Sequence, residues 1–441
     1  MTSFIRTLGR AGLALTFLVG TSTLAFAGPL QNRVEALESE LKALKEQIQA
    51  GDAKVEAIDA RTADLDDLPI FDPTQLKLTS RDGKNSIRVG GGIYLDGVIY
   101  DIDQAGTNVS DHGAEFRLIR LFAEGKVAGA FKYKLEVDFD GDDASHTIDF
   151  KDVYIAYVGH KGVEVKAGHF KAPQGLEELT SDNFTTFMER ALMHQNHAFS
   201  PARQVGLQLA HRGEDFGIAA GYFFEGDFVN GDTNTSAEAN EGVTGRAWFA
   251  PVKEKKKTVH VGVGASFRNN GGNTLHLEAQ PANHNAPELV DATISSANWD
   301  DYAAVTPEVA VVFGPFSAQA EYAFLDIQGK GGAPDADAQS FYVFGSWFVT
   351  GHNRPYKVKK GAFGRIKGDN AVEVAVRYDH LDASDTAFTN GAEISNLTFG
   401  VNYYFNPFVR AMLNVTTTDV DANAGPDSDG ETVGSRLQVD F

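Results

Sequence analysis

The chain has 441 residues, of which 60 are Asp or Glu and 39 are Lys or Arg, so its formal net charge is −21. This acidic balance argues against a partner with a phosphate backbone, and we expect no binding of nucleic acid. Cysteine is absent, which excludes disulfide frameworks, thiolate metal sites and cysteine nucleophiles. The 45 glycines, 31 phenylalanines and 13 tyrosines favour strands and turns, and a hydrophobic fraction of only 42% excludes a helical membrane bundle.

Residues 1–27 have the three parts of a secretory signal peptide. Arg6 and Arg10 precede an apolar stretch at 11–20. Residues 25–27 (Ala-Phe-Ala) then have the small-x-small pattern of a cleavage site. The apolar stretch is shorter than the roughly 20 residues that a membrane-spanning helix needs. We therefore expect a cleaved export signal, and because no later stretch is long and apolar enough, the exported chain would enter a membrane only with strands.

Residues 28–60 have the apolar spacing of a coiled coil. The pattern steps by four and three residues, which is the a/d rhythm of a heptad repeat, through Leu30, Val34, Leu37, Leu41, Leu44 and Ile48. Charges that flank this seam would pair between neighbouring chains, Arg33 with Glu38 and Glu40 with Lys45. We expect self-association, and a lone amphipathic helix lying on the barrel is the alternative. Residues 61–80 are expected to be a linker, since prolines at 69 and 73 prevent a helix from continuing.

Residues 81–441 alternate between apolar and polar side chains with a period of two, which indicates strands with one apolar face. In the stretch 131–140, for example, Leu135 belongs to the apolar face and Glu136 to the charged one. Roughly sixteen segments of about 8 to 14 residues have this pattern, a suitable number and length for the tilted strands of a transmembrane barrel. Their centres lie near Gly91, Leu118, Leu135, Val153, Val165, Leu207, Ala220, Arg246, Val263, Val309, Ala320, Phe344, Val374, Phe399, Leu413 and Leu437.

The connections between these segments also favour a barrel. Short links, such as the one at 128–130, alternate with long polar loops at 171–203, 270–300 and 421–431. Porins have short periplasmic turns and long outer loops. The chain stops on an aromatic residue in an alternating segment, and we expect Phe441 to be the membrane-insertion terminus. We therefore predict an all-β fold, a 16-stranded antiparallel transmembrane β-barrel that encloses a water-filled channel and follows a short N-terminal coiled-coil helix.

Five stretches of the barrel segment are similar to stretches of a known protein family, and they occur in the same order along the chain. They are Gly168–Ser181, Thr186–Leu192, Phe199–Gly206, Phe348–Gly368 and Glu373–Tyr378. On these stretches the chain resembles the phosphate-selective porin family (O and P type), trimeric outer-membrane channels, some of which have a leading coiled coil. The resemblance implies a homotrimer in the outer membrane of a Gram-negative bacterium, in contact with outer-membrane lipid, that passes small inorganic anions such as phosphate.

The resemblance also implies a pore that an inward-folded loop narrows and that Arg and Lys line. The loop at 171–203 follows the fifth strand and is the candidate for this constriction. The second strand resembles the Arg-rich strand of the family at Arg117 and Arg120 and departs from it at Leu118. Because these two arginines have opposite parity, both can face the lumen only if a β-bulge lies between them.

Strand alternation and the resemblance together give the bases that we expect to line the channel and bind anions. Arg can bind phosphate oxygens bidentately, whereas Lys acts as a point charge. The alternative is a lattice of salt bridges that only holds the barrel wall, because acids such as Glu136, Glu178 and Glu189 are neighbours in the sequence or on a strand. The predicted channel-lining bases are Arg117, Arg120, Lys132, Lys134, Lys166, Lys171, Arg190, Arg203 and Arg377.

The net charge of the chain would favour cations in a long-range field, but salt screens charges in outer loops, and selectivity is decided at the narrowest point. The alternative function is therefore a general or cation-tolerant porin whose coiled coil mainly tethers or stabilises the envelope. His194 and His197 are spaced by three residues, yet the sequence fixes no third ligand, so we predict no metal site. The sequence places no nucleophile beside a base, and we predict neither catalytic residues nor a cofactor.

Overall fold

The computed structural model describes residues 27–66, 68–139, 148–225 and 240–441. These residues belong to two units, Met1–Leu68 and Pro69–Phe441. The predicted signal peptide, apart from its last residue, lies outside the described residues. Within the described part, no helix combines the length and the apolar character needed to cross a bilayer.

The first unit contains the helix α1 (Ala27–Asp66). The helix continues beyond residue 60, where the predicted coiled-coil segment ends, and stops before Pro69, which cannot continue it. The side chains of Val34, Leu37, Leu41, Leu44 and Ile48 are each 50–60% exposed, while that of Leu30 lies outside the described side chains. An apolar stripe of this kind is stabilised only when another surface covers it, so self-association through α1 stays a prediction.

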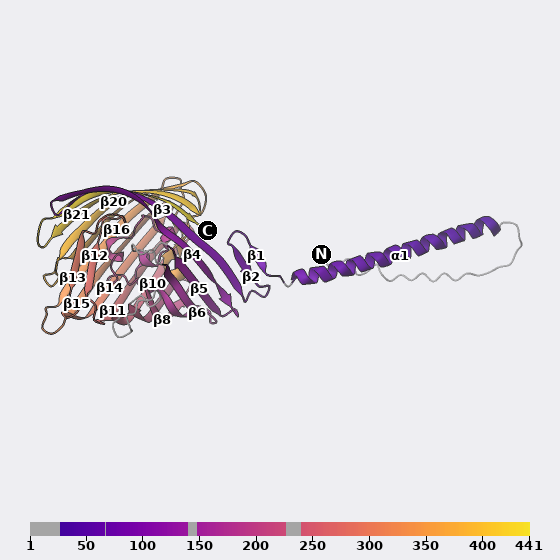
Figure 1. Ribbon diagram of the computed structural model, residues 1–441. Coiled ribbons are helices and arrows are strands. Elements are labelled where there is room, and N and C mark those ends of the chain that lie inside the picture. The colour runs from indigo at the N-terminus through magenta and orange to yellow at the C-terminus, as the bar shows by residue number, and fades with distance from the viewer. Residues whose placement is uncertain (1–26, 67, 140–147, 226–239) are drawn as a thin grey trace. The chain divides into compact units, whose positions relative to one another are not determined.

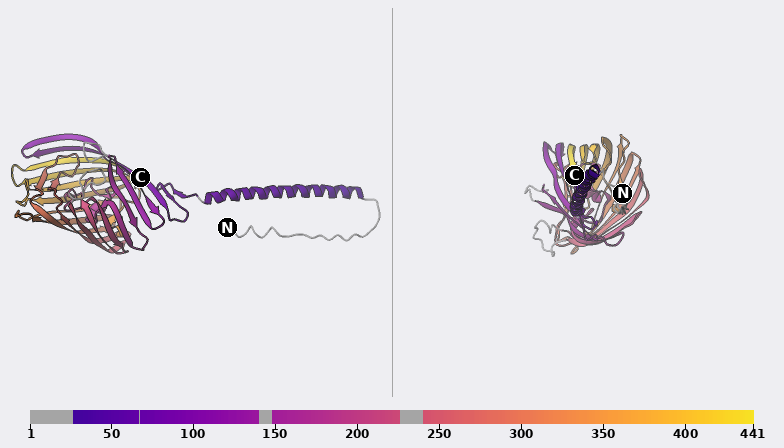
Figure 2. Two further views of the ribbon diagram at one scale, coloured as in Figure 1. Left: turned by 60° about the horizontal axis from the view of Figure 1, so that its bottom comes forward. Right: turned by 90° about the vertical axis from the view of Figure 1, so that its right-hand side faces the viewer.

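The second unit is a closed antiparallel β-barrel (Figures 1 and 2). Sixteen described strands pair in succession, and β22 pairs with β3, so the barrel has no free edge. Each predicted segment centre lies in a different one of these strands, which confirms the predicted fold. The strands are β3 (Ser86–Gln104), β4 (Thr107–Val127), β5 (Phe131–Asp138), β6 (Asp149–Tyr157), β7 (Val163–Lys171), β8 (Arg203–Arg212), β9 (Phe216–Glu225), β10 (Asn240–Glu254), β11 (Lys257–Asn269), β14 (Trp299–Phe313), β15 (Phe316–Gly329), β16 (Ala336–Phe348), β19 (Ala371–Ala383), β20 (Ala392–Asn406), β21 (Val409–Ala422) and β22 (Ser428–Asp440).

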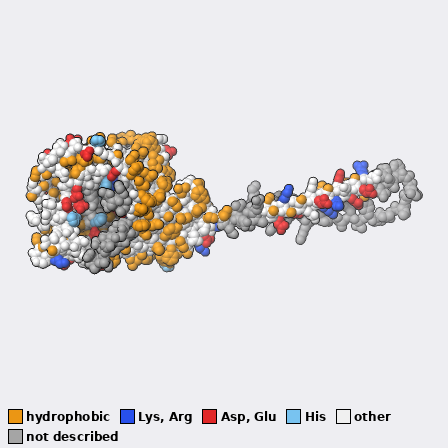
Figure 3. Space-filling view, viewed as in Figure 1, with side chains coloured by type: hydrophobic (Ala, Val, Ile, Leu, Met, Phe, Trp, Pro, Cys, Tyr) orange, Lys and Arg blue, Asp and Glu red, His pale blue; other side chains and the backbone are white. Residues whose placement is uncertain are grey.

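Side chains along these strands alternate between the outside and the inside of the barrel. Leu135 and Leu437 are exposed on the outside, whereas their neighbours Glu136 and Arg436 are buried inside. Figure 3 shows the hydrophobic side chains as a broad band over the outer face of the strands. This distribution, with charged side chains inside and leucines outside, is the reverse of the one found in water-soluble proteins. The outer band therefore faces lipid, and the inner face lines the lumen.

A small hairpin replaces part of the predicted linker at 61–80. Strands β1 (Ile70–Asp72) and β2 (Lys77–Thr79) pair with each other, and β2 pairs with the start of β3. Pro73 lies in the turn, where Asp72 Oδ1 accepts a hydrogen bond of 2.9 Å from the N–H of Thr74. Residues 70–79 are therefore an extension of the barrel sheet. The prolines at 69 and 73, from which a linker was predicted, did not indicate these strands.

The two ends of the barrel differ in their connections. Phe441 closes the end that carries the short turns, where it exchanges two backbone hydrogen bonds of 3.0 Å with Gly91. One connection at this end is long, between β16 and β19, and includes β17 (Tyr356–Lys357), η3 (Val358–Lys360) and β18 (Ala362–Phe363). The opposite end carries the predicted constriction loop, with α2 (Leu176–Leu179), η1 (Asp182–Phe184) and η2 (Leu192–His194), and the loop with β12 (Leu275–Ala279) and β13 (Val290–Ile294).

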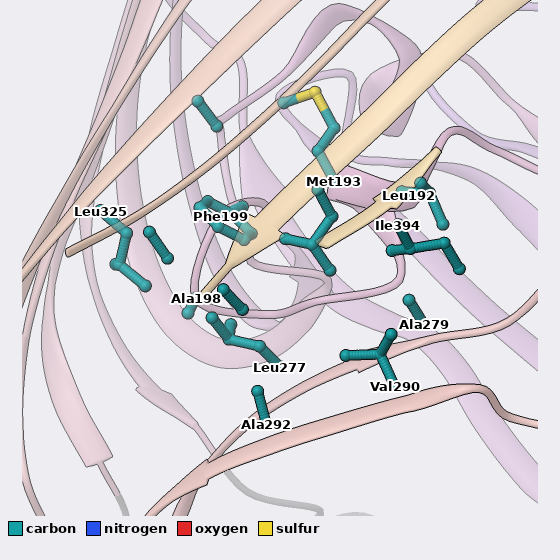
Figure 4. Packing of buried hydrophobic residues seen from close by; sticks show 14 of the residues in the cluster. Leu192, Met193, Ala198, Phe199, Leu277, Ala279, Val290, Ala292, Leu325 and Ile394 are labelled. Atoms are coloured by element: carbon teal, nitrogen blue, oxygen red, sulfur yellow. The ribbon is translucent and has the colours of Figure 1, made fainter. Parts of the chain in front are cut away.

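Two of these loops meet the wall in an apolar core inside the barrel, part of which Figure 4 shows. Met193 and Phe199 of the constriction loop pack with Leu277 of the β12–β13 hairpin and with Leu325 and Ile394 of the wall. The segment 270–300, predicted to be a polar outer loop, instead places alternating apolar side chains in this core. Because this region excludes water, the water-filled space is confined to the remaining part of the lumen.

Candidate functional site: a charged cavity inside the barrel

A cavity of about 750 Å³ lies between the constriction loop and the inner wall of the barrel. Its lining comes from strands on both sides of the loop, from the loop itself and from the start of β12. Five of the nine predicted bases lie in this lining: Arg117, Arg120, Lys171, Arg190 and Arg203. The closed barrel thus brings together five predicted bases that lie up to 86 residues apart in the sequence.

A β-bulge in β4 brings both arginines of that strand into the cavity. Phe116 and Leu118 pair with consecutive residues of β3, which leaves Arg117 as an extra residue in the ladder. A bulged residue changes the parity of its side chain relative to the strand on either side. Arg117 therefore faces the lumen together with Arg120. This bulge is the condition under which the sequence predicts that both arginines line the channel.

Asp182, in the constriction loop, is the centre of one cluster of charges. Its carboxylate lies 3.0 Å from Arg120 Nη1 and 3.9 Å from Lys171 Nζ, and it also pairs with Arg190. Burial alone would raise the pKa of Asp182, but the charges of Arg190, Lys171 and Arg120 outweigh burial and hold that pKa well below its usual range. Lys171 is also held by Glu178, whose Oε1 is 2.8 Å from its Nζ. Both loop carboxylates thus face bases of the wall.

Glu189 is the centre of a second cluster. Its Oε1 lies 3.2 Å from Arg117 Nε and 2.7 Å from Arg436 Nη2. Burial alone would raise the pKa of Glu189, but Arg117 and Arg436 together lower it to about 2. A carboxylate with so low a pKa keeps its charge, and its contribution to stability, until the pH falls through about 2. The ion pairs of the loop therefore persist at neutral pH.

The wall next to Arg203 is also a lattice of ion pairs. Arg203 Nε lies 2.8 Å from Asp152 Oδ1, and Lys134 Nζ lies 2.9 Å from the other oxygen of Asp152. Glu136 contacts both bases, at 3.4 Å from Arg203 and 3.0 Å from Lys134. The pairing of Lys134 with Glu136 was anticipated from their spacing along one strand.

The other predicted bases lie elsewhere. Lys132 and Lys166 are on the inner wall outside the cavity lining, at 3.6 Å and 3.8 Å from Glu164. Arg377 does not reach the cavity, in contrast to the prediction, because the constriction loop covers it. It is fully buried and donates a hydrogen bond of 2.9 Å to the backbone oxygen of Glu189. Alternation along a strand tells which face a base occupies, but not whether a loop covers it.

Some residues of the cavity were not in the predicted set. Strand parity places Arg436 inside the barrel, although it was not among the predicted anion-binding bases, whereas no local signal in the sequence indicates the role of Asp182. The two histidines of the loop do not converge. His194 Nε2 lies 3.0 Å from Glu321, whereas the half-exposed ring of His197 lies 3.7 Å from Glu225. His194 thus anchors the loop to the wall.

Comparison with known proteins gives a family for this fold and cavity. The family model for phosphate-selective porins O and P matches residues 87–441. Porin O of Pseudomonas aeruginosa is 26% identical over 415 residues, which cover 86% of this chain and 94% of that protein.

Solved structures agree on the fold. The anion-selective porin from Comamonas acidovorans has a TM-score of 0.52 and 14% identity, over 81% of this chain and 100% of that one. The trimer form of OmpT from Vibrio cholerae has a TM-score of 0.52 and 13% identity, over 81% and 99%. Porins are channels and not enzymes. The match over the whole barrel from β3 onward establishes that this chain belongs to the phosphate-selective porin O and P family and is an outer-membrane porin.

Proposed function

We propose that this porin passes small hydrophilic solutes by diffusion and prefers anions, with phosphate foremost. The observation that carries the proposal is the gathering of bases from the wall and from the constriction loop around one cavity: Arg117, Arg120, Lys171, Arg190 and Arg203. In some of their ion pairs the base is the more exposed partner, as Arg117 is at 26% against 18% for Glu189. In others the acid is, as Asp182 is at 22% against 14% for Arg120. A solute in the cavity therefore meets basic side chains from both the wall and the loop.

Pairing with carboxylates does not remove the ability of these arginines to bind an oxyanion. A guanidinium has five N–H donors, and one carboxylate occupies at most two of them. Neighbouring acids weaken each site, which suits a channel, because an ion must leave a site as readily as it enters. The description of the family and the name of the relative from Comamonas acidovorans, an anion-selective porin, support the same preference.

The reversal potential in a KCl gradient tests the proposal. Wild-type channels in planar bilayers are expected to prefer chloride over potassium, and millimolar phosphate is expected to reduce the chloride current. In Arg117→Glu the cavity charge changes by two units, which at about 7 Å in water is worth on the order of 1 kcal/mol, so the permeability ratio should shift toward cations about fivefold.

The matched control is Arg81→Glu, which makes the same change of charge in the exposed turn between β2 and β3. It should leave the permeability ratio unchanged. A wild-type channel that prefers potassium and is indifferent to phosphate would overturn the anion proposal. An Arg117 variant that behaves like the control would remove this residue from the selectivity-determining set.

We further propose that the protein is exported by a cleaved signal at 1–27 and assembles as a homotrimer whose α1 helices form a coiled coil. The exposed seam of α1 and the trimer form of the OmpT neighbour support this assembly. Deletion of residues 28–66 is expected to lower the temperature at which the trimer dissociates in SDS gels, while single-channel conductance stays the same, because the barrel closes without α1. Loss of envelope integrity in cells, with an equally stable trimer, would instead favour the tethering function.

A further inference from the structure

The β12–β13 hairpin has one face in the apolar core and the other face turned away from it. Leu275, Leu277 and Ala279 are buried in the core. His276 and Glu278 alternate with them and lie on the opposite face, and Asp291 is directly opposite Glu278 in the register. The three polar side chains are about half exposed, at 47%, 53% and 49%. His276 and Glu278 also belong to the lining of the central cavity.

The donor atoms of this triad have the spacing of metal ligands. His276 Nδ1 lies 3.0 Å from Asp291 Oδ1 and 3.6 Å from Glu278 Oε1, and one ligand atom of each residue lies within 4.8 Å of the others. Around a tetrahedral ion with bonds of about 2.0–2.1 Å, neighbouring donors are about 3.3 Å apart. The observed distances lie on either side of this value, so small side-chain rotations would complete three of four ligand positions.

The backbone that carries these ligands is held in place by the constriction loop. The N–H of Glu278 donates to Asn196 Oδ1 at 2.7 Å, and Asn196 Nδ2 donates to the carbonyl oxygen of Glu278 at 2.9 Å. Gln195 makes the same pair of hydrogen bonds with the backbone of Gln280, at 3.1 Å and 3.4 Å. Ligands on a rigid hairpin lose little conformational freedom when an ion binds, which favours affinity.

The triad also has an excess of negative charge. Among the described residues, Glu278 and Asp291 each form an ion pair with the same residue, His276. A single imidazole does not balance these acids, so a cation is favoured at this position.

We propose that His276, Glu278 and Asp291 form a binding site for a divalent transition-metal ion, with Zn²⁺ as the best match to one imidazole and two carboxylates. The sequence did not predict a metal here, because Asp291 lies 15 residues from His276 and only the hairpin brings them together. The fourth position remains open for water or an anion. A bound ion neutralises the negative charge of the two carboxylates at the cavity, and this effect on permeation rests on the proposed anion preference.

Isothermal titration of the purified full-length porin with ZnCl₂, in detergent and without phosphate or chelators, tests the site. We expect one saturable site per chain, with affinity reduced at least tenfold in His276→Ala and in Asp291→Asn. His160→Ala, which removes an exposed histidine from the short-turn end, should bind as the wild type does. Absence of saturable binding, or binding that both triad variants retain, would show that the triad is only an ion pair.

Bilayer recordings separate the site from its effect on permeation. Zn²⁺ added on the side of the β12–β13 hairpin should raise the chloride-to-potassium permeability ratio of the wild type and leave that of Asp291→Asn unchanged. Saturable binding without a change in this ratio would keep the metal site and overturn its role in permeation. The ratio measured before Zn²⁺ is added tests the anion preference itself, so failure of that proposal is recognised independently.

Discussion

Arg436→Met is expected to lower the free energy of unfolding by about 3–5 kcal/mol, because it leaves two carboxylates in the barrel without their main partner. Arg436 makes two hydrogen bonds of 2.7 Å to Asp96 and one of 2.7 Å to Glu189, and it donates to the backbone oxygen of Met188 at 2.6 Å. Its side chain and that of Asp96 are each 3% exposed. Urea titration of the barrel in lipid vesicles, followed by tryptophan fluorescence, measures the loss.

Two variants serve as controls for this prediction. Arg88→Met removes a half-exposed partner of Glu124, at 3.6 Å, and should cost less than about 1 kcal/mol. The double variant Arg436→Met with Asp96→Asn should recover part of the loss, since it removes the buried charge that the single variant leaves unpaired. A loss no larger than that of Arg88→Met would mean that water in the lumen solvates Asp96 as well as Arg436 does.

Glu321→Ala is expected to raise single-channel conductance and to increase the preference for anions, because it releases the α2 end of the constriction loop. Glu321 lies on β15 and accepts hydrogen bonds from the N–H groups of Leu176 and Glu177 at the start of α2, and from Tyr342 Oη at 2.8 Å. His194 of the same loop lies 3.0 Å away. Hydrogen bonds to a charged acceptor are worth about 1.5–3 kcal/mol each, so their loss is on the order of 5 kcal/mol.

The effect on selectivity follows from the position of Asp182, three residues after α2 ends. When α2 leaves the wall, this carboxylate is expected to move away from Arg120, which then keeps Asp138 as its carboxylate partner at 2.7 Å and becomes more available to anions. Glu321→Gln retains one acceptor oxygen and should have a smaller effect. Glu124→Gln removes a lumen carboxylate that pairs with Arg88, outside the loop, and should leave the conductance close to that of the wild type. Equal conductance in all three variants would show that Glu321 does not hold the constriction.

The strands could be predicted because each one carries its own signal. Leu135 and Glu136 have opposite environments wherever β5 lies in the barrel, since lipid outside and water or protein inside impose the same period of two on every strand. The inward position of Arg436 and the need for a bulge at Arg117 follow from the same local rule. The sequence by itself therefore determined the number of strands, their faces and the barrel that closes them.

The tertiary structure decided which inward groups meet, because those contacts join segments that are distant in the sequence. Arg436 and Asp96 are 340 residues apart, and the hydrogen bond between Leu176 and Glu321 spans 145 residues. Whether a lumen base faces water or lies beneath a loop, as Arg377 does, depends on how the loops fold back into the barrel. Strand periodicity reports only the environment on each side of a strand, whereas the cavity, its ion pairs and the triad on the hairpin depend on side chains that closure of the barrel brings together.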